Sequence, residues 1–75
     1  MKKTIMLFAG TTEGRRICEF LTVKKCITHV YVTTEYGKEL LPGQNNVHIH
    51  VGKMDEKQMS DEISVIHPDI VIDAT

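Results

Sequence analysis

Residues 9–14 read Ala-Gly-Thr-Thr-Glu-Gly, and these residue types are typical of a turn that binds an anion. Small residues let a phosphate approach the backbone, and a helix that begins here offers unpaired N–H groups and a positive dipole. Thr11 and Thr12 add hydroxyl donors. Glu13 would compete with a phosphate, so its carboxylate either caps the helix or points away. We therefore predict a diphosphate site at this turn.

The same turn is an imperfect match to the Gly-x-Gly-x-x-Gly fingerprint of dinucleotide-binding folds. If Gly14 is the third glycine, Ala9 and Thr11 occupy the first two positions. The pattern alone also fits a tight strand-to-helix turn without a ligand. Its place in the chain favours a dinucleotide, because it follows the first apolar strand and opens the first helix.

A second candidate segment, Thr33–Tyr36, follows about twenty residues later, where dinucleotide-binding folds contact the adenosine ribose. An acidic residue here hydrogen-bonds the ribose of NAD, whereas NADP sites tend to have hydroxyl or basic residues. Glu35 suits NAD, and the hydroxyls of Thr33 and Thr34 suit NADP. These residues alone do not choose between the two cofactors.

The hydrophobic pattern predicts the strands that position these segments. Ile5–Ala9 is a continuous apolar run, as in a parallel strand buried on both faces, and Thr28–Thr34 is rich in β-branched and aromatic residues. Val47–Val51 alternates, which indicates an edge strand, and Asp69–Asp73 has an apolar centre. The expected fold is α/β: the N-terminal half of a Rossmann-like doubly wound parallel sheet, with about four strands and two to three helices.

Helical patterns separate these strands. Gly14 begins an apolar stripe at helical spacing, which would let the first helix approach the sheet closely. The stripe continues with Ile17, Cys18 and Leu21. Tyr36–Leu41 fits a short helical turn before Pro42. Asp55 and Gln58, three residues apart, predict a capping box at the start of a further helix.

Ligands of open parallel sheets bind outside the carboxyl ends of the strands. Four segments of this chain meet that description. The candidate cofactor-binding residues in them are Gly10, Thr11, Thr12, Glu13, Thr33, Thr34, Glu35, Tyr36, Gly52, Ala74 and Thr75. We assign no catalytic residue and no metal ligands, because His48 and His50 share a strand face but have no evident third ligand nearby.

Composition narrows the class of protein. The net charge of −1 over 75 residues lacks the basic excess of a nucleic-acid binder, so no nucleic-acid partner is expected. The longest apolar run is too short to span a membrane. Cys18 and Cys26 do not have the spacing of a zinc knuckle or a redox pair, and Cys18 is expected to be a core residue. We therefore expect a cytosolic protein.

Four motifs occur in order along nearly the whole chain, at Ala9–Arg15, Thr34–Pro42, Gly52–Asp55 and Ile70–Thr75. Together they resemble the precorrin-6A and cobalt-precorrin-6A reductases of cobalamin biosynthesis. In that family the first motif reads glycine-Thr-x-Glu-Gly-Arg, the third Gly-Arg-Leu-Asp, and the last Asp-Ala-Thr followed by His-Pro. This chain departs in having Ala9 where many members have glycine, and Lys53 where they have arginine.

The resemblance implies an enzyme that uses NADPH to reduce one double bond of a tetrapyrrole macrocycle by hydride transfer. It further implies that Gly10–Glu13 cradle the diphosphate, that Thr34–Tyr36 bind the adenosine end, and that Ala74 and Thr75 lie near the nicotinamide. Residues 1–75 would be an incomplete N-terminal dinucleotide-binding domain, inactive alone and prone to self-association through its last strand. Precorrin-6A and cobalt-precorrin-6A both remain open as substrates.

Two other classes of protein were compared with this interpretation. A non-catalytic regulatory module that binds NAD(H) through the same first turn remains the alternative. A flavodoxin-like receiver domain is set aside, because it needs acidic residues after the first strand and a phospho-accepting aspartate at the end of the third. Here those places hold Ala9-Gly10 and Val51-Gly52.

Overall fold

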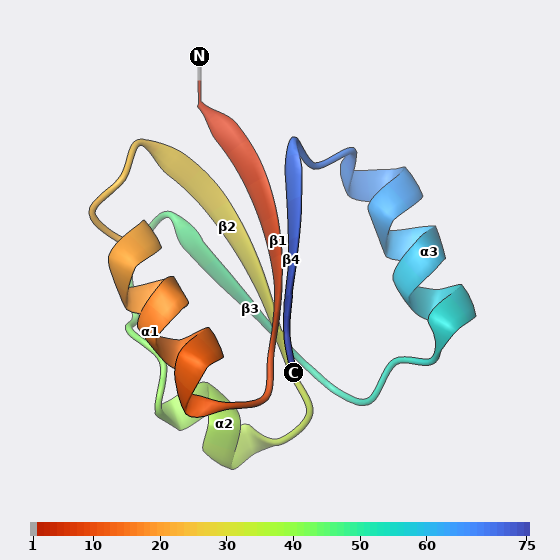
Figure 1. The fold of residues 1–75 in the computed structure, drawn as a ribbon, viewed down its shortest axis with the longest axis horizontal. Helices are drawn as coiled ribbons and strands as arrows, with labels where there is room; N and C mark the ends of the chain where they lie inside the picture. Colours follow the sequence, from red (N-terminus) through yellow and green to blue (C-terminus); the bar gives the residue numbers. More distant parts are fainter. Residues whose placement is uncertain (1) are drawn as a thin grey trace.

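The first strand, β1 (Lys3–Ala9), is an inner strand of the sheet in the computed structural model, which describes residues 2–75. It pairs in parallel with β2 (Cys26–Val32) and with β4 (Ile70–Ala74). β2 pairs in parallel with β3 (Val47–Val51), so the strand order is β3-β2-β1-β4 (Figure 1). The predicted α/β fold with a Rossmann-like parallel sheet is confirmed, as is the edge position of 47–51.

Helices cover both faces of this sheet. Helices α1 (Thr12–Leu21) and α2 (Glu35–Glu39) lie on one face, and α3 (Glu56–Ile66) lies on the other (Figure 1). Successive side chains of a strand point to opposite faces. The core on the α1 face contains Ile5, Leu7, Ala9, Cys18 and Leu21, and the core on the α3 face contains Met6, Phe8 and Tyr31, against which Met59 and Ile63 pack.

The order of the strands reverses beside β1. The chain moves outward from β1 through β2 to β3 and then crosses back to β4, on the other side of β1. In open α/β sheets this switch point is where ligands bind, outside the carboxyl ends of the strands. The turn that follows β1 therefore lies where ligands bind in this class of fold.

Several element boundaries differ from the sequence prediction. β2 spans Cys26–Val32 and not 28–34, because Cys26 pairs with Lys3 and because Thr34 leaves the strand to cap α2. α2 accordingly begins at Glu35, one residue earlier than predicted. β4 begins and ends one residue later than predicted, because its last residue pairs with Ala9.

The start of α3 follows the predicted capping box. The Gln58 amide N–H donates to Asp55 Oδ1 at 2.8 Å, and the Asp55 amide N–H donates to Gln58 Oε1 at 2.8 Å. The helix ends at Ile66, and its C-cap, His67, has a left-handed conformation with φ of 52° and precedes Pro68. Residues next to the two ends of α3 therefore determine where the helix begins and ends.

Candidate functional site

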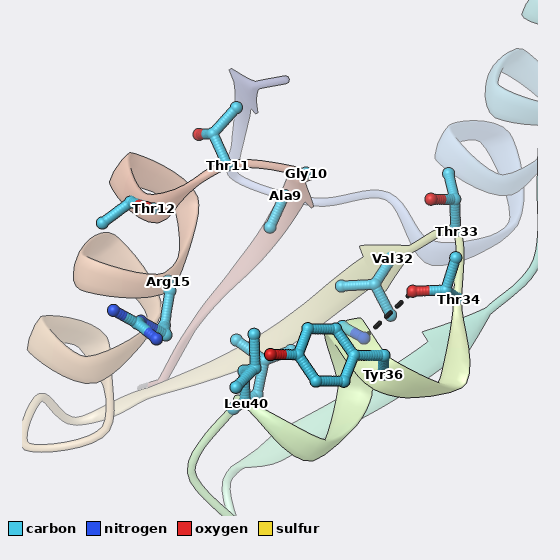
Figure 2. Close-up of a pocket in the computed structure, with 12 residues that line it drawn as sticks. Ala9, Gly10, Thr11, Thr12, Arg15, Val32, Thr33, Thr34, Tyr36 and Leu40 are labelled. Atoms are coloured by element: carbon cyan, nitrogen blue, oxygen red, sulfur yellow. Dashed lines mark hydrogen bonds between the residues drawn. The ribbon is translucent and has the colours of Figure 1, made fainter.

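A pocket of about 340 Å³ opens at the carboxyl ends of β1 and β2. One wall is the turn from β1 into α1, and the other is the segment that runs from β2 through α2 (Figure 2). The structure thus brings together two segments that the sequence proposed separately. The predicted site residues that line this pocket are Gly10, Thr11, Thr12, Thr33, Thr34 and Tyr36.

The turn after β1 presents backbone donors. Thr11 is the N-cap of α1, and its Oγ1 accepts a hydrogen bond from the Gly14 amide at 3.3 Å. The first turn of a helix leaves its amides without intrahelical partners, so the N–H groups of Thr12 and Glu13 stay free within residues 2–75. Gly10 is exposed beside them. The turn can therefore donate hydrogen bonds to an anion.

Gly14 brings α1 close to the sheet, as predicted from its place on the buried stripe. A Cβ atom at this position would lie 2.7 Å from Ala9 Cβ and 2.9 Å from Ala9 Cα. Both distances are shorter than carbon atoms tolerate without a shift. Glycine is therefore required here for packing, because α1 and β1 touch through their backbones.

The second wall combines hydroxyl groups with apolar surface. Thr34 is the N-cap of α2, and its Oγ1 accepts a hydrogen bond from the Gly37 amide at 3.0 Å. Thr33 is exposed, and no hydrogen bond within residues 2–75 engages its hydroxyl. Figure 2 shows the Tyr36 ring beside Leu40, with its hydroxyl end directed towards the α1 side of the pocket.

The structure places the other predicted residues outside this pocket. Glu13 and Glu35 are exposed first-turn residues of α1 and α2, and neither is among the lining residues. Gly52 lies in a separate pocket of about 220 Å³ on the α3 side, and its φ of 141° favours glycine. Ala74 is the last residue of β4 and Thr75 follows it, beside the first turn, where the Thr11 hydroxyl donates to Ala74 O at 2.9 Å.

Six residues that line the pocket were not among the predicted site residues: Ala9, Arg15, Val32, Gly37, Leu40 and Leu41. Arg15 is half-buried on the first turn of α1 and brings a guanidinium to the pocket from the side opposite Tyr36 (Figure 2). Leu40 and Leu41 supply apolar wall after α2. The spacing of Arg15, three residues beyond Thr12, would have indicated the same helical face. The leucines gave no such signal, because their place depends on where α2 ends.

Comparison with protein-family models gives a match over most of the chain. Residues 4–75 match the family described as precorrin-6x reductase CbiJ/CobK, which is nearly the whole chain. The chain belongs to this family. Membership in the precorrin-6x reductase family implies a reductase role in cobalamin biosynthesis. No curated protein and no solved structure matched the chain.

Several structural features of this precorrin-6x reductase chain lie outside the pocket. Cys18 is buried in the core, as predicted, and burial, aided by the Glu19 carboxylate, raises the pKa of its thiol to about 11. A thiol with so high a pKa is a poor nucleophile at neutral pH.

Within residues 2–75, no helix is long and apolar enough to cross a membrane, and no group of three or more potential ligands is arranged to hold a metal ion.

The reductase chain has a cluster of imidazoles on the α3 side of β2 and β3. His29 Nδ1 lies 3.1 Å from His50 Nε2, and the ring of His48 stacks on that of His29 at 5.1 Å between centroids. Tyr31 stacks on His50 at 4.6 Å and donates its hydroxyl to Glu62 Oε2 at 2.9 Å. The two histidines of β3 thus lie against a third from β2, which sequence spacing did not reveal.

We expect this cluster to make the stability of the reductase chain fall as the pH is lowered below about 6.5. Burial lowers the pKa of His29 from its ordinary value of 6.5, and the positive charges of His50 and His48 lower it further, against the opposing effect of the Glu62 carboxylate. The unfolded state therefore binds a proton at a higher pH than the folded state, and stability is lost as the pH falls through this range.

The measurement is the free energy of unfolding in urea across this pH range, for the parent protein and for His29→Gln. The variant lacks the titrating ring, so its curve should be flatter below pH 6.5. Parallel curves for the two proteins would show that His29 is not the group responsible.

Proposed function

We propose that this chain binds NADPH and forms the cofactor-binding part of a reductase that reduces one double bond of precorrin-6A or cobalt-precorrin-6A. The observation that carries the proposal is the pocket across the ends of β1 and β2, with backbone donors on one wall and apolar surface on the other. Such a combination suits a ligand with a charged diphosphate and a planar base. The family match supports the reductase role.

Each wall has a distinct part in this proposal. The free amides of Thr12 and Glu13, with the exposed backbone of Gly10, would hold the diphosphate. A Cβ atom at Gly10 would meet only Thr75 Cα, at 4.0 Å, so the space beside this residue is open to a ligand. Tyr36 and Leu40 offer apolar surface for the adenine. A bound NADPH would supply the hydride for the reduction.

Arg15 and Thr33 support NADPH over NADH. Arg15 is the cation of the pocket, and a guanidinium is well suited to bind a phosphate. The exposed hydroxyl of Thr33 lies on the facing wall. Glu35, the residue that would favour NADH, does not line the pocket. We infer that the 2′-phosphate lies between these walls, close to Arg15.

The macrocycle site is proposed to be completed by further protein that packs beside β4. Ile70 and Val71 in this strand are 48% and 46% exposed, and β4 is an edge strand of the sheet, so its outer side is open to a further element. Ala74 ends β4, and it would border the nicotinamide together with Thr75. We propose that residues 1–75 are the dinucleotide-binding part and that they do not reduce the substrate alone.

Replacing Arg15 tests the cofactor assignment. In the complete enzyme, Arg15→Leu should lower kcat/KM with NADPH by about tenfold to a hundredfold, because a hydrogen bond to a charged group contributes about 1.5–3 kcal/mol. Activity with NADH should change little. Steady-state kinetics with each cofactor measures both effects.

Arg16→Leu is the matched control, because Arg16 is exposed on the same helix and does not line the pocket. It should leave the ratio of the two kcat/KM values unchanged. A parent enzyme that prefers NADH would contradict the proposal, and binding of the cofactor without any hydride transfer would favour a regulatory module instead.

A further inference from the structure

One hydroxyl group links the two sides of the switch point. Thr11 Oγ1 donates to Ala74 O at 2.9 Å, although 63 positions separate the two residues, and it accepts from the Gly14 amide at 3.3 Å. A threonine hydroxyl has one proton to donate, and here Ala74 receives it. Figure 2 shows the Thr11 side chain directed away from Tyr36 and Leu40. The Thr11 hydroxyl therefore bonds to the protein backbone and has no proton left to donate to a ligand.

The segment that receives this hydrogen bond is itself well defined. Ala74 pairs with Ala9 across β1 and β4. Beyond it, the amide and the hydroxyl of Thr75 both donate to Asp73 Oδ1, at 3.3 Å and 2.8 Å. The Thr11 side chain thus links the turn after β1 to the end of β4.

We propose that Thr11 is a positioning residue, which fixes the end of β4 against the glycine turn so that the two halves of a bound dinucleotide are held in register. This inference rests on the proposed NADPH binding. The adenosine half would lie between the walls formed by the turn and α2, and the Thr11 side chain points away from Tyr36 and Leu40 on the second wall. The nicotinamide half would lie past Thr75, where placement depends on the Thr11–Ala74 bond.

Thr11→Val keeps the shape of the side chain and removes both hydrogen bonds, whereas Thr11→Ser keeps the hydroxyl. In the complete enzyme, Thr11→Val should lower kcat by about tenfold to a hundredfold, the range expected for a small misplacement of reacting groups. Its dissociation constant for 2′,5′-ADP, which has no nicotinamide, should match that of the parent. In the absence of cofactor, amide hydrogen exchange at residues 73–75 should be faster in Thr11→Val than in the parent. Thr11→Ser should restore both the parental kcat and the parental exchange rate.

Asp55→Ala controls for the loss of a helix cap, because Asp55 caps α3 outside the pocket. It should lower the melting temperature and leave kcat unchanged. The inference is overturned if Thr11→Val keeps the parental kcat, if Thr11→Ser is as impaired as Thr11→Val, or if affinity for 2′,5′-ADP falls as far as kcat. A parent enzyme that binds neither 2′,5′-ADP nor NADPH would instead overturn the proposed function.

Discussion

Gly14→Ala should destabilise the protein by about 1–3 kcal/mol, as over-packing of a well-packed core does. The added methyl group would lie 2.7 Å from Ala9 Cβ and 2.9 Å from Ala9 Cα, and the latter is backbone that has no room to rotate away. It would also lie 3.3 Å from Ala74 O, so the shift would disturb β4 as well as β1. Thermal unfolding should show a melting temperature lower by about 4–8 °C per kcal/mol.

The direction of this effect is informative, because helix propensity alone predicts the opposite. In an open helix position, replacing glycine with alanine stabilises by up to about 1 kcal/mol. Gly43→Ala, in the loop between α2 and β3, controls for the added methyl group, because a Cβ atom there would have no neighbour within 4 Å. It should be neutral or slightly stabilising. If Gly14→Ala behaved like Gly43→Ala, the close approach of α1 to the sheet would be wrong.

Gly10→Val should weaken NADPH binding by about tenfold to a hundredfold, which corresponds to the loss of about 1.5–3 kcal/mol for a hydrogen bond to a charged group. The valine side chain would stand beside the free amides of Thr12 and Glu13 and keep the diphosphate from the backbone. A fluorescence titration of the parent and variant proteins with NADPH measures the two dissociation constants.

The fold itself should tolerate this change. A Cβ atom at Gly10 meets only Thr75 Cα, at the ordinary contact distance of 4.0 Å. The melting temperature of Gly10→Val should therefore stay close to that of the parent, unlike that of Gly14→Ala. Equal NADPH affinities for Gly10→Val and the parent would remove the diphosphate from this turn.

Local sequence was enough to predict much of the fold. Apolar runs identified the strands, and the capping box of Asp55 and Gln58 marked the start of α3. The stripe that begins at Gly14 gave the correct buried face of α1. These features depend on neighbours within one helical turn or one strand, so a short stretch of sequence is enough to predict them.

Features that depend on partners distant in sequence were harder to predict. The start of β2 at Cys26 is set by pairing with Lys3, and the last residue of β4 is set by pairing with Ala9. The meeting of His29 with His50 depends on the register of β2 and β3. A sequence pattern does not specify such register until both strands are placed.

In the candidate site, too, local features could be predicted from sequence and contacts between distant residues could not. The turn after β1 and the segment after β2 were both predicted, because each has its own residue types. That they share one pocket follows from the parallel pairing of β1 and β2. Arg15 was missed because it reaches the pocket only through its place on the face of α1. The hydrogen bond from Thr11 to Ala74 was missed because it joins residues from opposite ends of the chain.

The central claim is that NADPH binds across the turn after β1 and the segment after β2, and amide chemical-shift mapping of the isotopically labelled protein tests it most directly. Titration with NADPH should give saturable shifts that are largest at Gly10–Thr12 and Thr33–Tyr36, on the two walls of the pocket. The amides of His29 and His48, whose side chains stack on the α3 side of the sheet, should shift little. Saturable shifts confined to that histidine face, or no shifts at Gly10–Thr12, would contradict the claim.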